Sequence, residues 1–145
     1  MIRTMKITDY QQVYDVWTSC RGMGLNSIDD TQEGIDRFLK RNPATCFVAE
    51  EAGKIIGVIL SGHDGRRGYI YHTAVHPEKR GKGIGRMLVE ASIQALKKEG
   101  ITKTALVVFT RNAQGNRFWQ EQGFSARDDL VYRNKALQEM VRMDT

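Results

Sequence analysis

Residues 78–86, "EKRGKGIGR", place three glycines among four cations. The segment follows a β-rich run that closes at Pro77, and it precedes a stretch with helical periodicity. Glycines at such a turn let backbone N–H groups converge on one point, and the start of a helix adds positive potential. The segment can therefore bind a pyrophosphate. It can equally be a tight turn whose cations face water, and both hypotheses remain open at this level.

Two established phosphate-binding patterns do not fit this segment. A P-loop needs two glycines separated by four residues and followed by Lys and Ser or Thr, and the chain has no such spacing. A dinucleotide fingerprint starting at Gly81 would need its third glycine at Arg86. The remaining pattern is Arg80-x-x-Gly83-x-Gly85.

Periodicity and turn residues predict the elements that position this segment. The predicted strands are residues 1–7, 45–51, 54–64, 68–75, 103–110 and 128–137, and the predicted helices are residues 9–20, 31–42, 84–100 and 112–123. Asp30 and Glu33 give the second helix a capping signature, and a further short strand is possible near Phe124. A hairpin followed by β-turn-α-β units predicts an α/β (α+β) fold. In such a sheet, ligands bind at the carboxyl ends of the strands.

Length and composition limit the functions to consider. We expect residues 1–145 to form one domain, with 41% hydrophobic and 27% charged residues. The sequence contains no apolar run of about 20 residues and no signal-peptide core, so we expect a cytoplasmic protein without a membrane partner. The net charge of +5 raises nucleic acid as a partner, but the sequence has no extended basic tract and we expect none. Cys20 and Cys46 are isolated, and the three histidines show no metal-ligand spacing.

The motifs of the chain resemble those of the GNAT superfamily of acyl-CoA-dependent N-acetyltransferases. The segment "AVHPEKRGKGIG" matches the family's central motif, Gln/Arg-x-x-Gly-x-Gly/Ala after a strand that ends in Val. The segment "NAQGNRFWQEQGF" matches its next motif, with Asn112, Gly115, Trp119, Gly123 and Phe124 at the corresponding positions. The amino-terminal residues and the hairpin "FVAEEAGKIIGVI" match as well, so the resemblance covers nearly the whole chain.

The resemblance implies a GNAT-type, mostly antiparallel central sheet with helices on both faces, and it implies acetyl-CoA as co-substrate. The implied reaction is direct attack of a primary amine, on a small molecule or a peptide, on the thioester. No metal takes part, and the protein is a monomer or a homodimer. The implied cofactor-binding residues are Ala74, Val75, Arg80, Gly81, Lys82, Gly83, Ile84, Gly85, Arg86, Asn112 and Trp119. The Val75 N–H is implied to polarise the thioester carbonyl.

The chain departs from the family pattern at Trp119. The family usually has a tyrosine there, which can protonate the departing thiolate, whereas an indole N–H is no acid near neutral pH. The thiolate is then protonated by water or by another tyrosine, or it leaves without being protonated by the protein. An acyl-CoA-binding module without catalysis is the alternative function.

The strand before the glycine segment contains the candidates for acid–base chemistry. Tyr71 and His72 precede Val75 and can reach an incoming amine, although they alternate faces unless a bulge shifts them. Tyr132 is a weaker candidate, and His72 is equally suited to a structural hydrogen bond. Residues 21–30 and 61–68 are expected to meet the acceptor. Their charged candidates are Asp29, Asp30, Asp64, Arg66 and Arg67.

Overall fold

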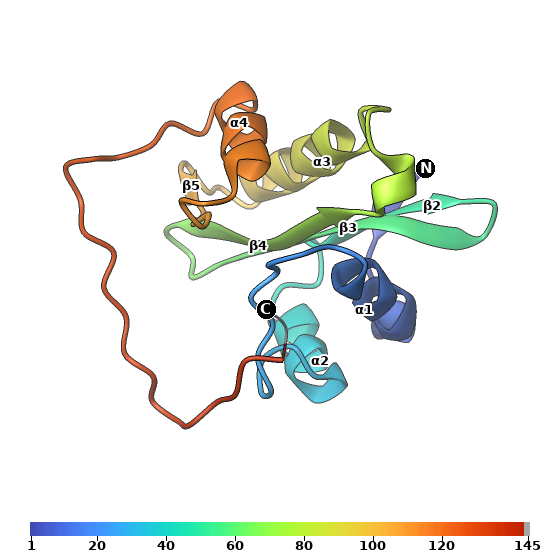
Figure 1. Ribbon diagram of the computed structural model, residues 1–145, viewed down its shortest axis with the longest axis horizontal. Helices are drawn as coiled ribbons and strands as arrows, with labels where there is room; N and C mark the ends of the chain where they lie inside the picture. Colours follow the sequence, from blue (N-terminus) through green and yellow to red (C-terminus); the bar gives the residue numbers. More distant parts are fainter. Residues whose placement is uncertain (144–145) are drawn as a thin grey trace.

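The computed structural model describes residues 1–143, which form a twisted five-stranded sheet covered by helices (Figure 1). The strands lie in the order β1 (Ile2–Thr4), β2 (Phe47–Glu51), β3 (Lys54–His63), β4 (Gly68–Val75) and β5 (Thr104–Ala105). Every neighbouring pair is antiparallel except β4 and β5, which are parallel. The predicted mixed, mostly antiparallel sheet is confirmed.

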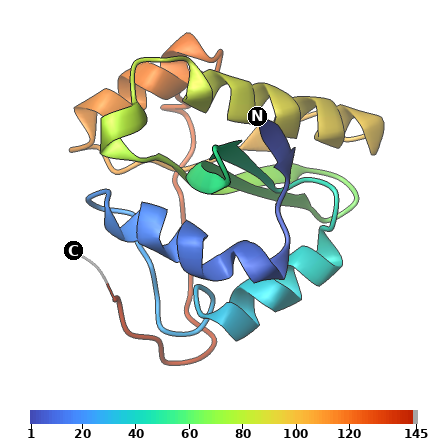
Figure 2. The same cartoon turned by 90° about the vertical axis from the view of Figure 1, so that its right-hand side faces the viewer.

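Helices cover both faces of the sheet, as predicted. The two views in Figures 1 and 2 show α1 (Tyr10–Thr18) and α2 (Gln32–Arg41) on one face of the sheet and α3 (Ile84–Lys98) and α4 (Ala113–Glu121) on the other. The sheet thus separates two hydrophobic cores, one around Trp17 and one around Leu88. Because side chains alternate along a strand, β3 supplies Val58 to the first core and Ile59 to the second.

A bulge in β4 changes which side chains share a face. Val58 pairs with Ala74 and Leu60 pairs with Tyr71, so β4 uses one residue more than β3 over this stretch. The extra residue resets the alternation of β4. As a result His72 turns toward α1, where its ring lies 5.3 Å from the ring of Trp17. The sequence allowed for such a bulge but could not predict it.

The sheet opens between β4 and β5. Their pairing covers only Gly68 with Thr104 and Tyr69 with Ala105, although β4 continues to Val75. The prediction of a strand over residues 103–110 is therefore correct for two residues only. Beyond this point β4 has no neighbouring strand on that edge. The exposed edge of β4 forms one wall of the cleft described below.

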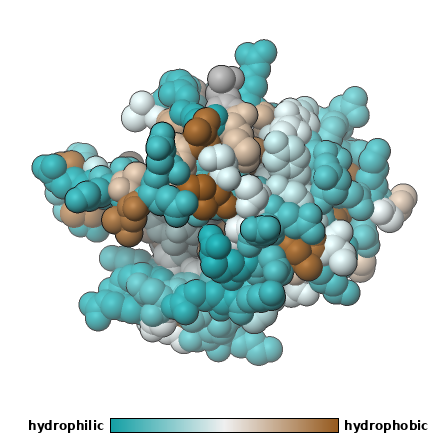
Figure 3. Space-filling model, turned by 90° about the horizontal axis from the view of Figure 1, so that it is seen from below, coloured by the Kyte–Doolittle hydropathy of each residue, from teal (hydrophilic) through white to brown (hydrophobic). Residues whose placement is uncertain are grey.

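The predicted strand over residues 128–137 is wrong. After α4 the described chain contains an isolated bridge between Asn26 and Arg142 but no strand. Figure 1 shows an extended segment that leaves α4 and returns to the α1–α2 loop. It is fixed there by the Ser27 N–H, which donates to the Val141 carbonyl at 2.8 Å. Leu130 and Val131 are exposed, and Figure 3 shows hydrophobic groups in small, separate patches on a mostly hydrophilic face. Strand propensity without a neighbouring edge to pair with does not form a strand.

The start of α2 also differs from the prediction. Thr31, rather than Asp30, caps the helix, with its Oγ accepting from the Gly34 N–H at 3.1 Å. Asp30 is buried and faces away from the helix terminus, toward β4. In residues 1–143, no helix is long and apolar enough to span a membrane.

Candidate active site

The glycine segment forms an open cradle at the start of α3. Gly81 and Gly83 both have a φ of 80°, the left-handed conformation that glycine adopts without strain. A Cβ on Gly81 would meet nothing within 4 Å, and one on Gly83 would meet only the Arg86 guanidinium, at 3.9 Å. The first N–H groups of a helix have no partner within the helix. The cradle therefore presents backbone donors to open space, which suits a phosphate group.

The four cations of this segment divide into two pairs. The Lys79 ammonium lies 2.7 Å from Glu51, which raises the pKa of Lys79 through their hydrogen bond. The Arg80 side chain turns back to donate to the Val75 carbonyl at 3.1 Å and to the Cys20 sulfur at 3.2 Å. The side chains of Lys82 and Arg86 make no hydrogen bond or ion pair with the described residues, and both are exposed. These two are the cations available to an anion in the cradle.

The end of β4 presents one backbone donor to the cleft. The His76 N–H donates to the Ile56 carbonyl of β3 at 2.8 Å, and Ala74 pairs with Val58 of the same strand. Successive residues of a strand direct their N–H groups to opposite edges. The Val75 N–H is therefore directed at the opened edge, where β5 has already ended, whereas the backbone of Ala74 faces β3.

Two cavities meet along this edge. The first, of about 880 Å³, runs from the glycine cradle to α4, and the second, of about 660 Å³, runs along the other side of the opened strand. Both are lined by Met23, Thr73, Asn112 and Trp119. The cleft is thus continuous, and these four side chains mark the junction of its two halves.

Helix α4 holds two of the junction residues in place. The Asn112 side chain caps the helix by accepting from the Gly115 N–H at 2.8 Å. A Cβ at position 115 would lie 2.5 Å from the Asn112 amide nitrogen, so a larger residue there would require the Asn112 side chain to shift. The Trp119 ring lies edge-on between Phe118 and Phe124, with centroids 5.0 Å and 5.1 Å away.

Tyrosines and a histidine line the second half of the cleft. The rings of Tyr69 and Tyr71 lie 4.7 Å apart on β4, and His72 lies next to them because of the bulge. All three also line a further cavity of about 800 Å³, which extends toward α2. Burial raises the pKa of Tyr69 and of Tyr71 above the ordinary 10.0, so both phenols remain protonated at neutral pH.

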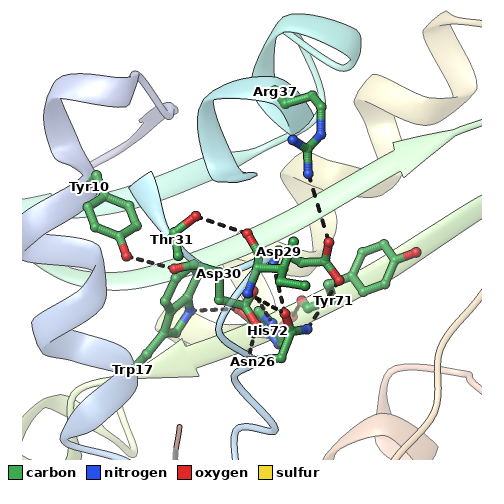
Figure 4. A network of polar contacts seen from close by, with 11 residues as sticks. Tyr10, Trp17, Asn26, Asp29, Asp30, Thr31, Arg37, Tyr71 and His72 are labelled. Carbon is green, nitrogen blue, oxygen red and sulfur yellow. Dashed lines mark hydrogen bonds and ion pairs between the residues drawn. The ribbon is translucent and has the colours of Figure 1, made fainter. Parts of the chain in front are cut away.

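A buried carboxylate holds His72. Figure 4 shows Asp30 in contact with both His72 and Tyr10, with Trp17 beside them. The His72 Nε2 lies 2.7 Å from the Asp30 Oδ1, and the side chain of Asp30 is only 3% exposed. The Trp17 Nε1 donates to the His72 carbonyl at 3.2 Å, so both the ring and the backbone of His72 are fixed.

The structure brings most of the predicted site residues into this one cleft. Val75, the cradle of residues 80–86, Asn112 and Trp119 surround the first half, apart from Lys82, which is not among its lining residues. Tyr71, His72 and Tyr132 line the second half. Asp64 and Arg67 line the third cavity, and the Asp64 carboxylate closes their turn by accepting from the N–H groups of Arg66 and Arg67.

Sequence reasoning missed two junction residues and one partner. Met23 lies in a loop and Thr73 inside a strand, and neither has a motif that marks it. The pairing of Asp30 with His72 joins residues 42 positions apart, for which the single sequence has no local signal. Within residues 1–143, no group of three or more potential metal ligands occurs.

The glycine cradle at the start of α3 and the opened strand beside it both lie within a segment that matches a known protein family. A sequence model of the acetyltransferase (GNAT) family matches residues 10–124, and the chain belongs to this family.

Relatives and solved structures agree with this assignment. An acetyltransferase of Sodalis glossinidius is 31% identical over 136 residues, which are 94% of each chain. The crystal structure of Ard1 from Thermoplasma volcanium matches with a TM-score of 0.75 and 25% identity, covering 86% of this chain and 82% of that one. The PaiA N-acetyltransferase of Thermoplasma acidophilum, solved with coenzyme A, matches with a TM-score of 0.77 and 21% identity, covering 88% and 91%.

Proposed function

We propose that this protein is an acetyl-CoA-dependent N-acetyltransferase that acetylates a primary amine of a small molecule or peptide by direct attack. The observation that carries the proposal is the continuous cleft, whose two cavities meet at Thr73, Asn112 and Trp119. One half offers backbone donors and two free cations to a phosphate. The other half offers aromatic rings and an imidazole to an amine. Transfer between two bound substrates needs both halves to open onto one point.

The first half fits coenzyme A. The open backbone over Gly81 and Gly83 leaves room for the pyrophosphate, with Lys82 and Arg86 adding positive charge. The structural neighbour PaiA was solved with coenzyme A, which supports the same ligand here. When bound, acetyl-CoA supplies an activated acetyl thioester. The Val75 N–H, directed into the cleft, would donate to the carbonyl oxygen of that thioester as negative charge develops on it.

The second half fits a cationic amine. The faces of Tyr69 and Tyr71 can attract an ammonium, and such a contact contributes about 0.5–1 kcal/mol at an exposed site. Their raised pKa values keep both phenols neutral, so neither serves as the base at neutral pH. His72 is then the residue that accepts the proton of the ammonium, directly or through one water.

Protons and bonds balance without a covalent enzyme intermediate. His72 takes one proton of the ammonium, and the free amine forms a bond to the carbonyl carbon while the bond from that carbon to sulfur breaks. The second proton leaves the new amide nitrogen for the CoA sulfur, through water. Trp119 cannot supply that proton. The proposed route requires no cysteine nucleophile, and burial raises the pKa of Cys46 to about 12.

The test is release of free CoA thiol from acetyl-CoA across a panel of amines. The panel should include polyamines, amino acids, aminoglycosides and peptides with free amino termini, each set against a reaction without enzyme. We expect turnover with at least one amine and an N-acetyl product by mass spectrometry. Coenzyme A binding without turnover on any amine would contradict the proposal and identify an acyl-CoA-binding module.

A further inference from the structure

We propose that Asp30 is a positioning residue that fixes His72 in the Nε2–H tautomer, so that Nδ1 is the nitrogen that receives the proton of the acceptor amine. This inference rests on the proposed function, because it assigns the atom that performs the proton transfer. It does not follow from any sequence motif of the chain.

The hydrogen bonds of Asp30 determine which way the proton of His72 points. The Asp30 Oδ2 accepts from the Asn26 N–H at 2.8 Å, and its Oδ1 lies 2.7 Å from the His72 Nε2. A carboxylate only accepts hydrogen bonds, so the Nε2 must carry the hydrogen. In a neutral imidazole the other nitrogen, Nδ1, then holds the lone pair.

Within residues 1–143, the His72 Nδ1 has no hydrogen-bond partner. His72 lines both the second cavity, which reaches the junction at Thr73, and the cavity toward α2. Its side chain is 15% exposed, so it is held by the protein but still reached from the cleft.

The loop that presents Asp30 is held rigidly. The Tyr10 hydroxyl donates to the Asp30 carbonyl at 2.6 Å, and the Asn26 side chain accepts from the N–H groups of Ile28 and Asp29. A Cβ on Gly34 would lie 2.4 Å from the carbonyl oxygens of Ile28 and Asp29, so α2 approaches this loop through a glycine. Such a supported arrangement is what a precisely oriented imidazole requires.

A second histidine–carboxylate pair in the chain shows the contrast. The His63 Nε2 lies 2.8 Å from the Glu99 Oε1, and the His63 Nδ1 accepts from the Gly65 N–H at 2.9 Å. Both ring nitrogens of His63 are therefore occupied, and its partner Glu99 is 37% exposed. His63 is held by a turn and cannot take up another proton without losing a bond. Only the buried pair leaves one nitrogen free.

Few other charged or titratable groups surround His72. In the described chain, apart from Asp30, they are Tyr69 and Tyr71 on the same strand, Tyr132 in the same cavity, Tyr10 on α1, and Asp29, which pairs with Arg37 of α2 at 3.9 Å. Tyr71 and Tyr10 both have raised pKa values because of burial, so they stay neutral over the range in which an imidazole titrates.

The test compares Asp30→Asn with Glu99→Gln, the same change at the control pair. The Asn26 N–H requires the oxygen of the asparagine amide, so the amide NH2 would face His72, donate to Nε2 and move the imidazole hydrogen to Nδ1, which removes the base. For Asp30→Asn we expect a loss of kcat of about 10- to 100-fold at neutral pH. The KM for acetyl-CoA should remain unchanged, and activity should recover at alkaline pH. Glu99→Gln should keep the wild-type profile.

Nitrogen-15 NMR of the wild-type protein gives a readout that does not depend on activity. The chain has only three histidines, so the His72 signals can be assigned as those that are missing from the spectrum of His72→Gln. We expect the Nε2–H tautomer for neutral His72 in the wild type and the Nδ1–H tautomer in Asp30→Asn. The Nδ1–H tautomer in the wild type would overturn the inference, even if Asp30→Asn did not fold.

The same data separate this inference from the proposed function. A wild type that acetylates amines, together with an Asp30→Asn variant that keeps its rate and pH profile, would overturn the role of Asp30 alone. A wild type that acetylates no amine would overturn the proposed function and, with it, the catalytic part of this inference.

Discussion

The two halves of the cleft are built from different parts of the polypeptide. The half at the glycine segment consists of backbone, with left-handed glycines at 81 and 83 and the N–H groups that open α3. The half around His72 consists of side chains from segments far apart, since Asp30 and His72 are 42 residues apart. A site made of backbone depends on one short segment, whereas a site made of side chains depends on the whole fold. The two halves should therefore respond differently to substitution.

The largest effect is expected at the cradle. Gly83→Asp places a negative charge and a strained left-handed residue where the phosphate approaches, and it should weaken coenzyme A binding by on the order of 100-fold or more. Titration calorimetry with coenzyme A measures this. Gly100→Asp is the matched control, because Gly100 follows α3 with a φ of 82° and lies at the other end of that helix. Normal coenzyme A binding by Gly83→Asp would show that the pyrophosphate site lies elsewhere.

The next effect is expected at His72 and should spare coenzyme A binding. Without the base, His72→Ala should lose about 10²-fold or more in kcat at neutral pH. Its activity should recover as rising pH frees the amine, with the dissociation constant of coenzyme A within a few fold. The pH–rate profiles of His72→Ala, His63→Ala and the wild type test this. Equal losses in the two alanine variants would remove the distinction between the two histidines.

This difference explains what the sequence could predict. The glycine turn at the start of a helix could be located from the sequence, because glycines, cations and a helix start lie within nine consecutive positions. That this turn binds a phosphate remains a prediction. The mixed sheet and the four helices follow from periodicity and are confirmed. The bulge that turns His72 toward Trp17 could not be predicted, because it depends on how β4 registers with β3.

The errors of prediction have the same origin. Residues 103–110 and 128–137 have strand-like composition, but whether a strand forms depends on a neighbouring edge that the sequence does not specify. Asp30 was predicted to cap α2, since capping is a local rule, but its actual partner lies on β4. Local patterns therefore locate the glycine turn and name Tyr71 and His72 as candidates, whereas the pairing of Asp30 with His72 is visible only in the fold.

A smaller effect is expected at Gly34, which supports the loop that carries Asp30. A methyl group there would collide with the carbonyl oxygens of Ile28 and Asp29, at 2.4 Å, and displace the loop that carries Asp30. Gly34→Ala should lower the free energy of unfolding by roughly 1–3 kcal/mol and reduce kcat without weakening coenzyme A binding. Urea unfolding and kinetics measure both, with Gln32→Ala in the same helical turn as control. Unchanged stability and rate would show that the loop tolerates displacement.

The smallest effect is expected at Tyr71. Tyr71→Phe keeps the ring that faces an ammonium, so kcat should fall by less than about threefold. Burial raises the Tyr71 pKa above 10.0, so any decrease of rate caused by its ionisation should occur only above that pH. The rate should fall rather than rise with increasing pH, because a phenol that must stay protonated loses its function when it ionises. A tenfold loss together with a missing alkaline limb would instead make Tyr71 the acid of the reaction.

The central claim is that both halves of the cleft are filled at once and that the acetyl group passes directly between their ligands. The most direct test is initial-rate kinetics in which acetyl-CoA and the best amine of the panel are varied together. Direct transfer predicts double-reciprocal lines that intersect, because a ternary complex must form. Parallel lines, the pattern of a covalent acetyl-enzyme, would contradict the account.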